Sequence, residues 1–144
     1  MKNIIKNLRI SGFTLLELLV VIGIMGVMMA LATVAYSATQ RSGRDARRKQ
    51  DMIAMQNAME QYYSANSFTY PDICSAAGTY LKSTWPTDPS NVVPYIYNDA
   101  LSGTCTSASY CICATMEGAG GNSGGADCSF AVSNKTYYCV GSLQ

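Results

Sequence analysis

Residues 12–36 read GFTLLELLVVIGIMGVMMALATVAY. Phe13 to Tyr36 are 24 residues, and Glu17 is the only charged residue among them. A helix rises about 1.5 Å per residue, so this run would extend about 36 Å, more than the bilayer hydrocarbon core of about 30 Å. A core helix of a water-soluble protein would carry a polar stripe, and this run has none. The stretch therefore predicts a membrane-spanning helix over 13–36.

Two common kinds of membrane segment account for the apolar run but not for its charge. A secretory signal peptide would be cut near small residues such as Ala30-Leu31-Ala32, and a plain signal anchor would need only the apolar run and its flanking charges. A carboxylate inside a membrane helix costs about 2.5–3.5 kcal/mol on insertion scales, so it is rare without a function. Neither interpretation requires Glu17, or the small residues Ser11 and Gly12 at the membrane edge.

The segment that begins at Gly12 suggests a third interpretation. A short basic leader precedes Gly12-Phe13-Thr14-Leu15-Leu16-Glu17. This arrangement resembles the prepilin cleavage signal of type IV pilins and of type II secretion pseudopilins. The resemblance implies that a membrane-embedded aspartic peptidase, the prepilin peptidase, cuts the Gly12–Phe13 bond and removes a leader over 1–12. It also implies that the same enzyme N-methylates Phe13, the new first residue.

Cleavage at this bond would give Glu17 a partner. It would leave an ammonium on Phe13, one helical turn from Glu17, and N-methylation keeps that amine charged. Each charge is costly alone in lipid, and the pair is much less so. The resemblance implies that the glutamate reaches the N-terminal amine of a neighbouring subunit as a filament grows. Because such a pair would set the axial register, we expect Glu17 to be an assembly residue.

Charge and composition disfavour several function classes. The net charge of +1 gives no general affinity for nucleic acid. The chain has no histidine, which is the commonest general base and metal ligand, and no evident nucleophile–base pair. The glycine-rich segment 118–125 lacks the lysine and the strand–helix setting of a phosphate loop and indicates a flexible turn. We therefore expect no enzyme activity and no cofactor.

Basic residues follow the apolar run more densely than they precede it. They are Arg41, Arg44, Arg47, Arg48 and Lys49, and Asp45 is the only acidic residue among them. They indicate either a solvated collar near phospholipid headgroups or salt-bridge partners for acidic residues of a neighbouring subunit. A simple charge count places the C-terminus in the cytoplasm. The cysteines favour the opposite orientation. The resemblance implies a bacterial inner-membrane protein, and we expect its C-terminal domain to lie outside the cytoplasm.

Six cysteines occur, all in the C-terminal part: Cys74, Cys105, Cys111, Cys113, Cys128 and Cys139. An even number in a small, loop-rich region predicts disulfides and an oxidising compartment. A zinc site is the alternative, but Cys111 and Cys113 are separated by one residue and no pair has finger-like spacing. Of the fifteen possible connectivities, the first candidate bridge joins Cys111 or Cys113 to Cys139, because these residues fall on two short strands that could lie side by side.

The helical pattern continues beyond the membrane segment. Met52, Met55, Met59 and Tyr62 recur at spacings of three and four, which predicts a stripe packed on a core. Asp45 and Lys49 form an opposite-charge pair at i, i+4. No proline occurs before Pro71, so we expect one long helix over 13–66 that ends within 64–71.

Residues 67–144 are expected to form a globular β domain. The candidate strands are Tyr95–Tyr97, Tyr110–Met116, Phe130–Val132 and Thr136–Val140. The fold class is therefore α+β, a long N-terminal helix packed on a three- or four-stranded antiparallel sheet with disulfides. The segment Trp85-Pro86-Thr87-Asp88-Pro89 looks similar to the major pseudopilin of type II secretion, which implies a calcium loop. Asn122 and Asp127 offer too few oxygens to predict that site, and the metal content stays unknown.

The resemblance implies a structural function, with helical homo-oligomerisation into a filament. The expected partners are the membrane, the prepilin peptidase, an inner-membrane assembly platform and further copies of the chain. The protein would then become part of an extracytoplasmic or cell-surface filament. A pilus subunit and a pseudopilin that drives protein export are both consistent with the leader. A single-pass anchored binding module with exposed tyrosines is the alternative from another class.

Overall fold

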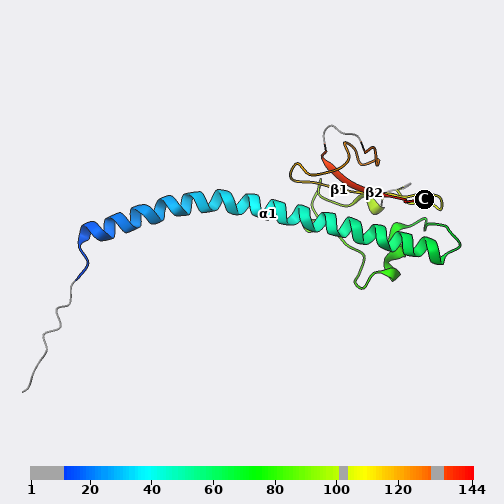
Figure 1. Ribbon diagram of the computed structural model, residues 1–144, viewed down its shortest axis with the longest axis horizontal. Helices are drawn as coiled ribbons and strands as arrows, with labels where there is room; N and C mark the ends of the chain where they lie inside the picture. Colours follow the sequence, from blue (N-terminus) through cyan, green and yellow to red (C-terminus); the bar gives the residue numbers. More distant parts are fainter. Residues whose placement is uncertain (1–11, 101–103, 131–134) are drawn as a thin grey trace, which may run out of the picture. The chain divides into compact units, whose positions relative to one another are not determined.

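The computed structural model describes residues 12–100, 104–130 and 135–144. Contacts divide the chain into a first unit that ends at Ala38 and a second unit, Thr39–Gln144. Helix α1 (Leu15–Ala65) runs from the first unit into the second. In chain order the second unit adds η1 (Cys74–Tyr80), η2 (Asn98–Ala100), β1 (Cys111–Thr115) and β2 (Tyr137–Gly141) (Figure 1). The α+β class is confirmed; residues 1–11 of the expected leader lie outside the described part of the chain.

The long helix expected over 13–66 is confirmed as α1 over Leu15–Ala65. It ends where Ser67 and Phe68 adopt φ values of 56° and 59°, in the left-handed region that a helix cannot contain. The Tyr62 carbonyl accepts hydrogen bonds from both the backbone N–H and the side-chain amide of Asn66, each at 2.9 Å. These bonds satisfy an acceptor near the helix end that would otherwise lack partners.

In the first unit, α1 exposes its apolar side chains on every side. From Phe13 to Leu31 the large apolar side chains are between 44% and 82% exposed. By length and composition, α1 is the one helix among the described residues that could cross a membrane. This surface has no partner within the described chain, so it requires lipid or other chains to cover it. The sequence-based prediction of a membrane-anchoring helix agrees with this exposure.

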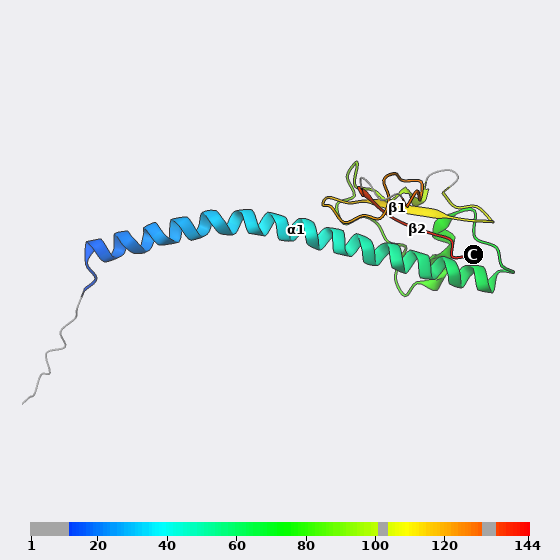
Figure 2. The same cartoon turned by 45° about the horizontal axis from the view of Figure 1, so that its top comes forward.

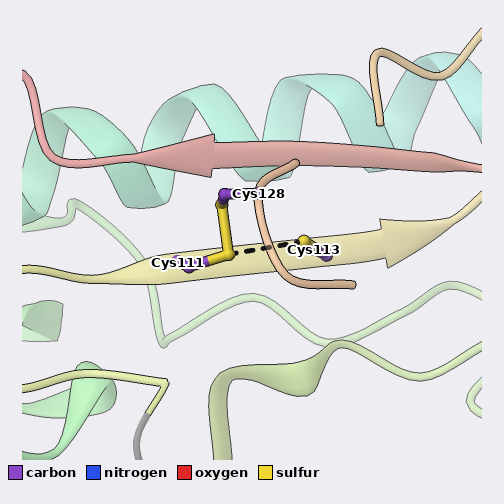
Figure 3. Close-up of side chains that lie close together, drawn as sticks. All are labelled: Cys111, Cys113 and Cys128. Atoms are coloured by element: carbon purple, nitrogen blue, oxygen red, sulfur yellow. Dashed lines mark hydrogen bonds between the residues drawn. A yellow bond between two sulfur atoms is a disulfide. The ribbon is translucent and has the colours of Figure 1, made fainter. Parts of the chain in front are cut away.

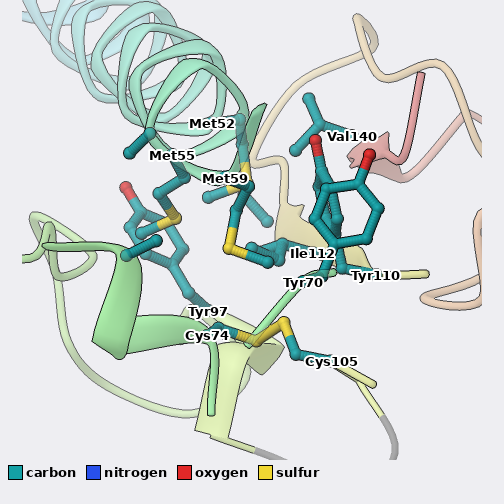
Figure 4. Packing of buried hydrophobic residues seen from close by; sticks show 13 residues of the cluster. Met52, Met55, Met59, Tyr70, Cys74, Tyr97, Cys105, Tyr110, Ile112 and Val140 are labelled. Atoms are coloured by element: carbon teal, nitrogen blue, oxygen red, sulfur yellow. A yellow bond between two sulfur atoms is a disulfide. The ribbon is translucent and has the colours of Figure 1, made fainter. Parts of the chain in front are cut away.

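The hydrophobic core of the second unit lies between α1 and the sheet. Met52, Met55 and Met59 are fully buried and belong to one cluster with Ile112 of β1 and Val140 of β2 (Figure 4). Residues three and four apart share one face of a helix, so the methionines form one continuous contact surface. The predicted core stripe is confirmed.

The sheet consists of β1 and β2, which pair antiparallel with Cys113 opposite Cys139 (Figure 2). The strands expected over Tyr110–Met116 and Thr136–Val140 are confirmed with slightly different ends. In the described part of the chain the sheet has two strands, fewer than the three or four expected.

The two other candidate strands account for the difference in strand number. The segment Tyr95–Tyr97 forms only an isolated bridge between Val92 and Tyr95. Its side chains turn to α1 instead, since the Tyr97 hydroxyl donates to Asp51 Oδ2 at 2.8 Å and the Tyr95 ring stacks against Arg48. Phe130 is not in a strand, and residues 131 and 132 of that candidate lie outside the described residues.

Candidate processing and assembly site and its supporting domain

The predicted scissile bond joins Gly12 to Phe13 immediately before α1. Gly12, Phe13 and Thr14 belong to no helix or strand. The Phe13 side chain is 82% exposed, and no atom lies within 4 Å of the position that a Cβ on Gly12 would take. Exposed chain outside regular structure is the form that peptidases cleave most readily. The geometry thus leaves this bond accessible.

Thr14 and Glu17 organise the first turn of α1. The Glu17 N–H donates to Thr14 Oγ1 at 3.2 Å, and the Leu18 N–H donates to the Thr14 carbonyl at 3.2 Å. Thr14 is therefore the N-cap, and Glu17 stands three residues later, at the spacing of a capping box. The helix dipole also favours a negative charge in this turn. Sequence reasoning missed the role of Thr14, although its signal was the pattern Thr-x-x-Glu ahead of an apolar run.

Two glycines interrupt the apolar surface of α1. No atom lies within 4 Å of a Cβ built on Gly23 or Gly26, so no contact within the described chain requires glycine at either position. Glycine lowers helix stability by about 1 kcal/mol relative to alanine. The two glycines therefore serve either close packing against other chains or local unwinding of the helix.

Comparison with known proteins bears on this N-terminal segment. Residues 7–33 match the family model of the prokaryotic N-terminal methylation motif, and the match spans the expected cleavage bond and Glu17. The chain carries the prepilin-type N-terminus of the type IV pilin-like family. It matched no curated protein and no solved structure. The motif implies processing by a prepilin peptidase, and with the apolar helix it supports membrane anchoring and filament assembly.

The second unit contains a buried ion cluster centred on Arg48. The Arg48 side chain is fully buried. Its Nε donates to Asp88 Oδ2 at 2.7 Å, and its Nη1 donates to Asp45 Oδ1 at 2.7 Å and to Glu117 Oε1 at 2.8 Å. The Tyr95 ring centroid lies 4.8 Å from the guanidinium carbon. The cluster joins α1 to two distant loops of the same chain.

This cluster corrects the interpretation of the basic residues after the apolar run. Arg48 is fully buried and Arg44 is 34% exposed, and both bind carboxylates of their own chain. Asp45 pairs with Arg48, not with Lys49 as the i, i+4 spacing suggested. Lys49 lies over the Tyr138 ring at 5.6 Å. Arg47, 66% exposed, retains the solvated character expected of a collar.

Glu117 links the cluster to the loop after β1. Arg44 Nε donates to Glu117 Oε1 at 2.6 Å, and Arg44 Nη2 donates to the other carboxylate oxygen, so the pair is bidentate. The hydrogen bonds from Arg44, followed by those from Arg48, lower the pKa of the Glu117 carboxyl to about 2. Glu117 therefore stays ionised through the whole physiological range.

A second polar cluster centres on Glu60 of α1. Glu60 accepts hydrogen bonds from the Tyr70 hydroxyl at 3.1 Å, the Tyr110 hydroxyl at 2.9 Å and the Leu143 N–H at 3.2 Å. Burial, together with the Glu60 carboxylate, raises the pKa of Tyr70 to about 12 and also raises the pKa of Tyr110. Both tyrosines therefore remain protonated donors at neutral pH. The cluster fastens α1 to the start of β1 and to the C-terminal tail.

All six candidate cysteines form intramolecular disulfides: Cys74–Cys105, Cys111–Cys128 and Cys113–Cys139. The bridge expected from Cys111 or Cys113 to Cys139 thus involves Cys113. A zinc ion binds thiolates, and none of these sulfur atoms is a thiolate. The disulfides therefore exclude the zinc alternative for this form of the protein.

Asn122 and Asp127, the two candidate calcium ligands, are engaged in the fold. Asn122 Oδ1 accepts from the Cys139 N–H at 2.7 Å, and its amide donates to the Cys139 carbonyl at 2.8 Å, so Asn122 covers the outer edge of β2. Asn98 Oδ1 accepts from the Cys113 N–H at 2.6 Å on the outer edge of β1. Asp127 Oδ1 accepts from the Ser129 hydroxyl at 2.7 Å, which lowers the pKa of Asp127. These contacts give the two residues structural roles.

Proposed function

We propose that this chain is a structural subunit of a type IV pilus-like filament and not an enzyme. It is inserted in the inner membrane as a prepilin, cut at Gly12–Phe13, methylated on Phe13 and polymerised through the apolar part of α1. The second unit then lies outside the cytoplasm, where an oxidising environment maintains three disulfides. The methylation motif over residues 7–33 supports the processing steps.

Glu17 is the observation that carries the proposal for assembly. It is the only charge between Phe13 and Tyr36, on a helix whose apolar surface has no partner in the described chain. The backbone capping by Thr14 leaves the Glu17 carboxylate free to reach another group. The ammonium created on Phe13 of a neighbouring subunit is a partner of opposite charge in the same apolar layer. Pairing there offsets the cost of burying both charges.

A pseudopilin of a type II secretion system is the second candidate. The segment Trp85–Pro89 favours it by its similarity to the major pseudopilin. In this chain Asp88 Oδ2 of that segment accepts a hydrogen bond from Arg48 Nε at 2.7 Å. The genes beside the coding sequence distinguish the two. An assembly ATPase with a retraction ATPase indicates a pilus, and a secretin with secretion-specific platform components indicates a pseudopilus.

The decisive experiment compares Glu17→Gln with Thr14→Ala in the cells that make the protein. Glu17→Gln retains the capping-box shape but removes the charge, whereas Thr14→Ala removes the N-cap acceptor at about 0.5–2 kcal/mol and keeps the charge. We expect Glu17→Gln to abolish or strongly reduce filaments and Thr14→Ala to retain most of them. Filaments are quantified by shearing and electron microscopy.

Processing is measured in the same samples. Intact mass of membrane-extracted protein should show loss of residues 1–12 and gain of one methyl group in wild type and in both variants. A mature start after Ala32 would restore the signal-peptide interpretation. Normal filament amounts in Glu17→Gln cells would refute charge pairing, and filament loss in Thr14→Ala cells alone would show that the helix cap, and not the Glu17 charge, controls assembly.

A further inference from the structure

Two of the three disulfides touch each other. Cys111 and Cys113 are alternate residues of β1, so their side chains leave the strand on the same face. Their Sγ atoms are 3.8 Å apart, with the bond to Cys128 beside them (Figure 3). Because both sulfurs are in disulfides and carry no proton, this approach is a van der Waals contact. Cys111–Cys128 and Cys113–Cys139 therefore place reactive sulfur atoms side by side.

The three disulfides differ in access to solvent. Cys113 and Cys139 are 2% and 1% exposed, and Cys74 and Cys105 are buried as well. Cys111 and Cys128 are both partly exposed. Thiol–disulfide exchange requires a thiolate to reach a disulfide sulfur, so access selects the bond that reacts. A thiol from solution therefore meets Cys111–Cys128 first.

The two sulfur atoms of that disulfide are held differently. Cys111 is fixed in β1 by the strand pairing with Gly141. Cys128 lies in a segment without helix or strand, after the glycine-rich loop 118–125. Once its bond is broken, Cys128 can move away from the sheet, whereas Cys111 stays beside Cys113. This asymmetry favours reaction of Cys111 with its neighbour over re-formation of the original bond.

We propose that Cys111–Cys128 is the site at which an exported dithiol oxidoreductase acts on this chain, and that Cys111 passes the exchange to the buried Cys113–Cys139 disulfide. One thiolate of the dithiol attacks Cys128 Sγ, forms a mixed disulfide and releases Cys111 as a thiolate. Cys111 attacks Cys113 Sγ, forms a Cys111–Cys113 bond and releases Cys139 as a thiolate. The second thiol of the dithiol then frees Cys128. In total the dithiol is oxidised to its disulfide, and the protein gains two electrons and two protons as the Cys128 and Cys139 thiols.

The exchange changes which elements are crosslinked. Cys113–Cys139 is a covalent rung between the two strands of the sheet, and Cys111–Cys113 is a link within β1 alone. Alternate residues of an extended strand keep their Cβ atoms about 6.5 Å apart, and a disulfide brings them to about 3.5–4.5 Å. The Cys111–Cys113 bond therefore forms only as β1 bends out of its extended form, which breaks part of its pairing with β2. A disulfide in a small exported domain is typically worth about 2–5 kcal/mol, so the exchanged form unfolds at lower denaturant concentration than the native form.

Limited reduction of the full chain in detergent tests this route. The protein is treated with one equivalent of dithiothreitol, quenched with acid, alkylated and mapped by mass spectrometry. We expect label on Cys128 and Cys139, with a Cys111–Cys113 bond recognised by a peptide two mass units lighter than its reduced form. Cys74 and Cys105 should remain unlabelled. Denatured, fully reduced protein, in which all six cysteines react, calibrates the labelling yield.

Two results would overturn the proposal. Equal label on Cys111 and Cys128, with Cys139 unlabelled, would show that the first disulfide opens without passing the exchange on. Label on Cys74 and Cys105 first would show that access does not select the reacting bond. A Cys113→Ala/Cys139→Ala double variant removes the acceptor disulfide, and there the label should move from Cys139 to Cys111.

Discussion

Replacing Arg48 by methionine should destabilise the second unit strongly. The side chain is fully buried and makes five hydrogen bonds, of which four go to carboxylates. Methionine retains the apolar volume but leaves Asp88, whose side chain is also fully buried, without its counter-charge. Removing one partner of a buried ion pair costs about 3–5 kcal/mol, because the remaining charge is uncompensated.

Urea unfolding of the full chain in detergent measures this cost. Trp85 is the only tryptophan, and its Nε1 donates to Asp99 Oδ2 at 2.6 Å within the second unit, so its fluorescence reports unfolding of that unit. With a urea dependence of about 2 kcal/mol per M, a loss of about 4 kcal/mol lowers the midpoint by about 2 M. The deficit should shrink as pH falls, because loss of Arg48 removes one of the two guanidinium groups that lower the pKa of Glu117, so this carboxyl takes up a proton more readily.

Arg47→Met is the matched control for this substitution. Arg47 is 66% exposed and lies 4.0 Å from Asp51, so its loss should change the free energy of unfolding by no more than about 0.5 kcal/mol. If Arg48→Met shifts the midpoint no further than Arg47→Met, the buried cluster does not stabilise the fold in the way described.

Three further predictions use the same unfolding assay. The folded pKa of Glu117, about 2, lies below its usual 4.5, so its contribution is complete above about pH 4.5 and is lost as pH falls toward 2; Glu117→Gln should flatten that slope, and an unchanged slope would contradict the assignment. Gly121→Ala should cost more than about 2 kcal/mol, since its Cβ would lie 2.2 Å from a backbone carbonyl of β2. Gly120→Ala, whose Cβ meets a flexible lysine ammonium at 3.2 Å, should cost far less, and equal costs would rule out the backbone clash. Tyr110→Phe removes a 2.9 Å hydrogen bond to the Glu60 carboxylate and should lower the free energy of unfolding by about 1.5–3 kcal/mol. An unchanged free energy of unfolding would show that this hydrogen bond does not stabilise the fold.

The sequence alone determined the features that depend on residues near one another in the chain. The membrane-spanning run and the methionine stripe follow from local composition and spacing, and the segment around Gly12 was recognised by its resemblance to the prepilin cleavage signal. A helix presents every third and fourth residue on one face, so Met52, Met55 and Met59 had to share a side whatever they packed against. The two strands around the Cys113–Cys139 rung were predicted for the same reason, because alternation within five residues fixes the face of each side chain.

Only the tertiary structure decided what those faces meet. The partners of Arg48 lie 40 and 69 residues away at Asp88 and Glu117, so the local pattern suggested Asp45–Lys49 and a solvated collar instead. The choice of Cys128 as the partner of Cys111 depends on the loop that brings it back over β1. Tyr95 forms only an isolated bridge with Val92, and its ring meets Arg48 of α1. In each case long-range packing selected one of several locally acceptable arrangements, and such contacts leave no periodic signal in the sequence.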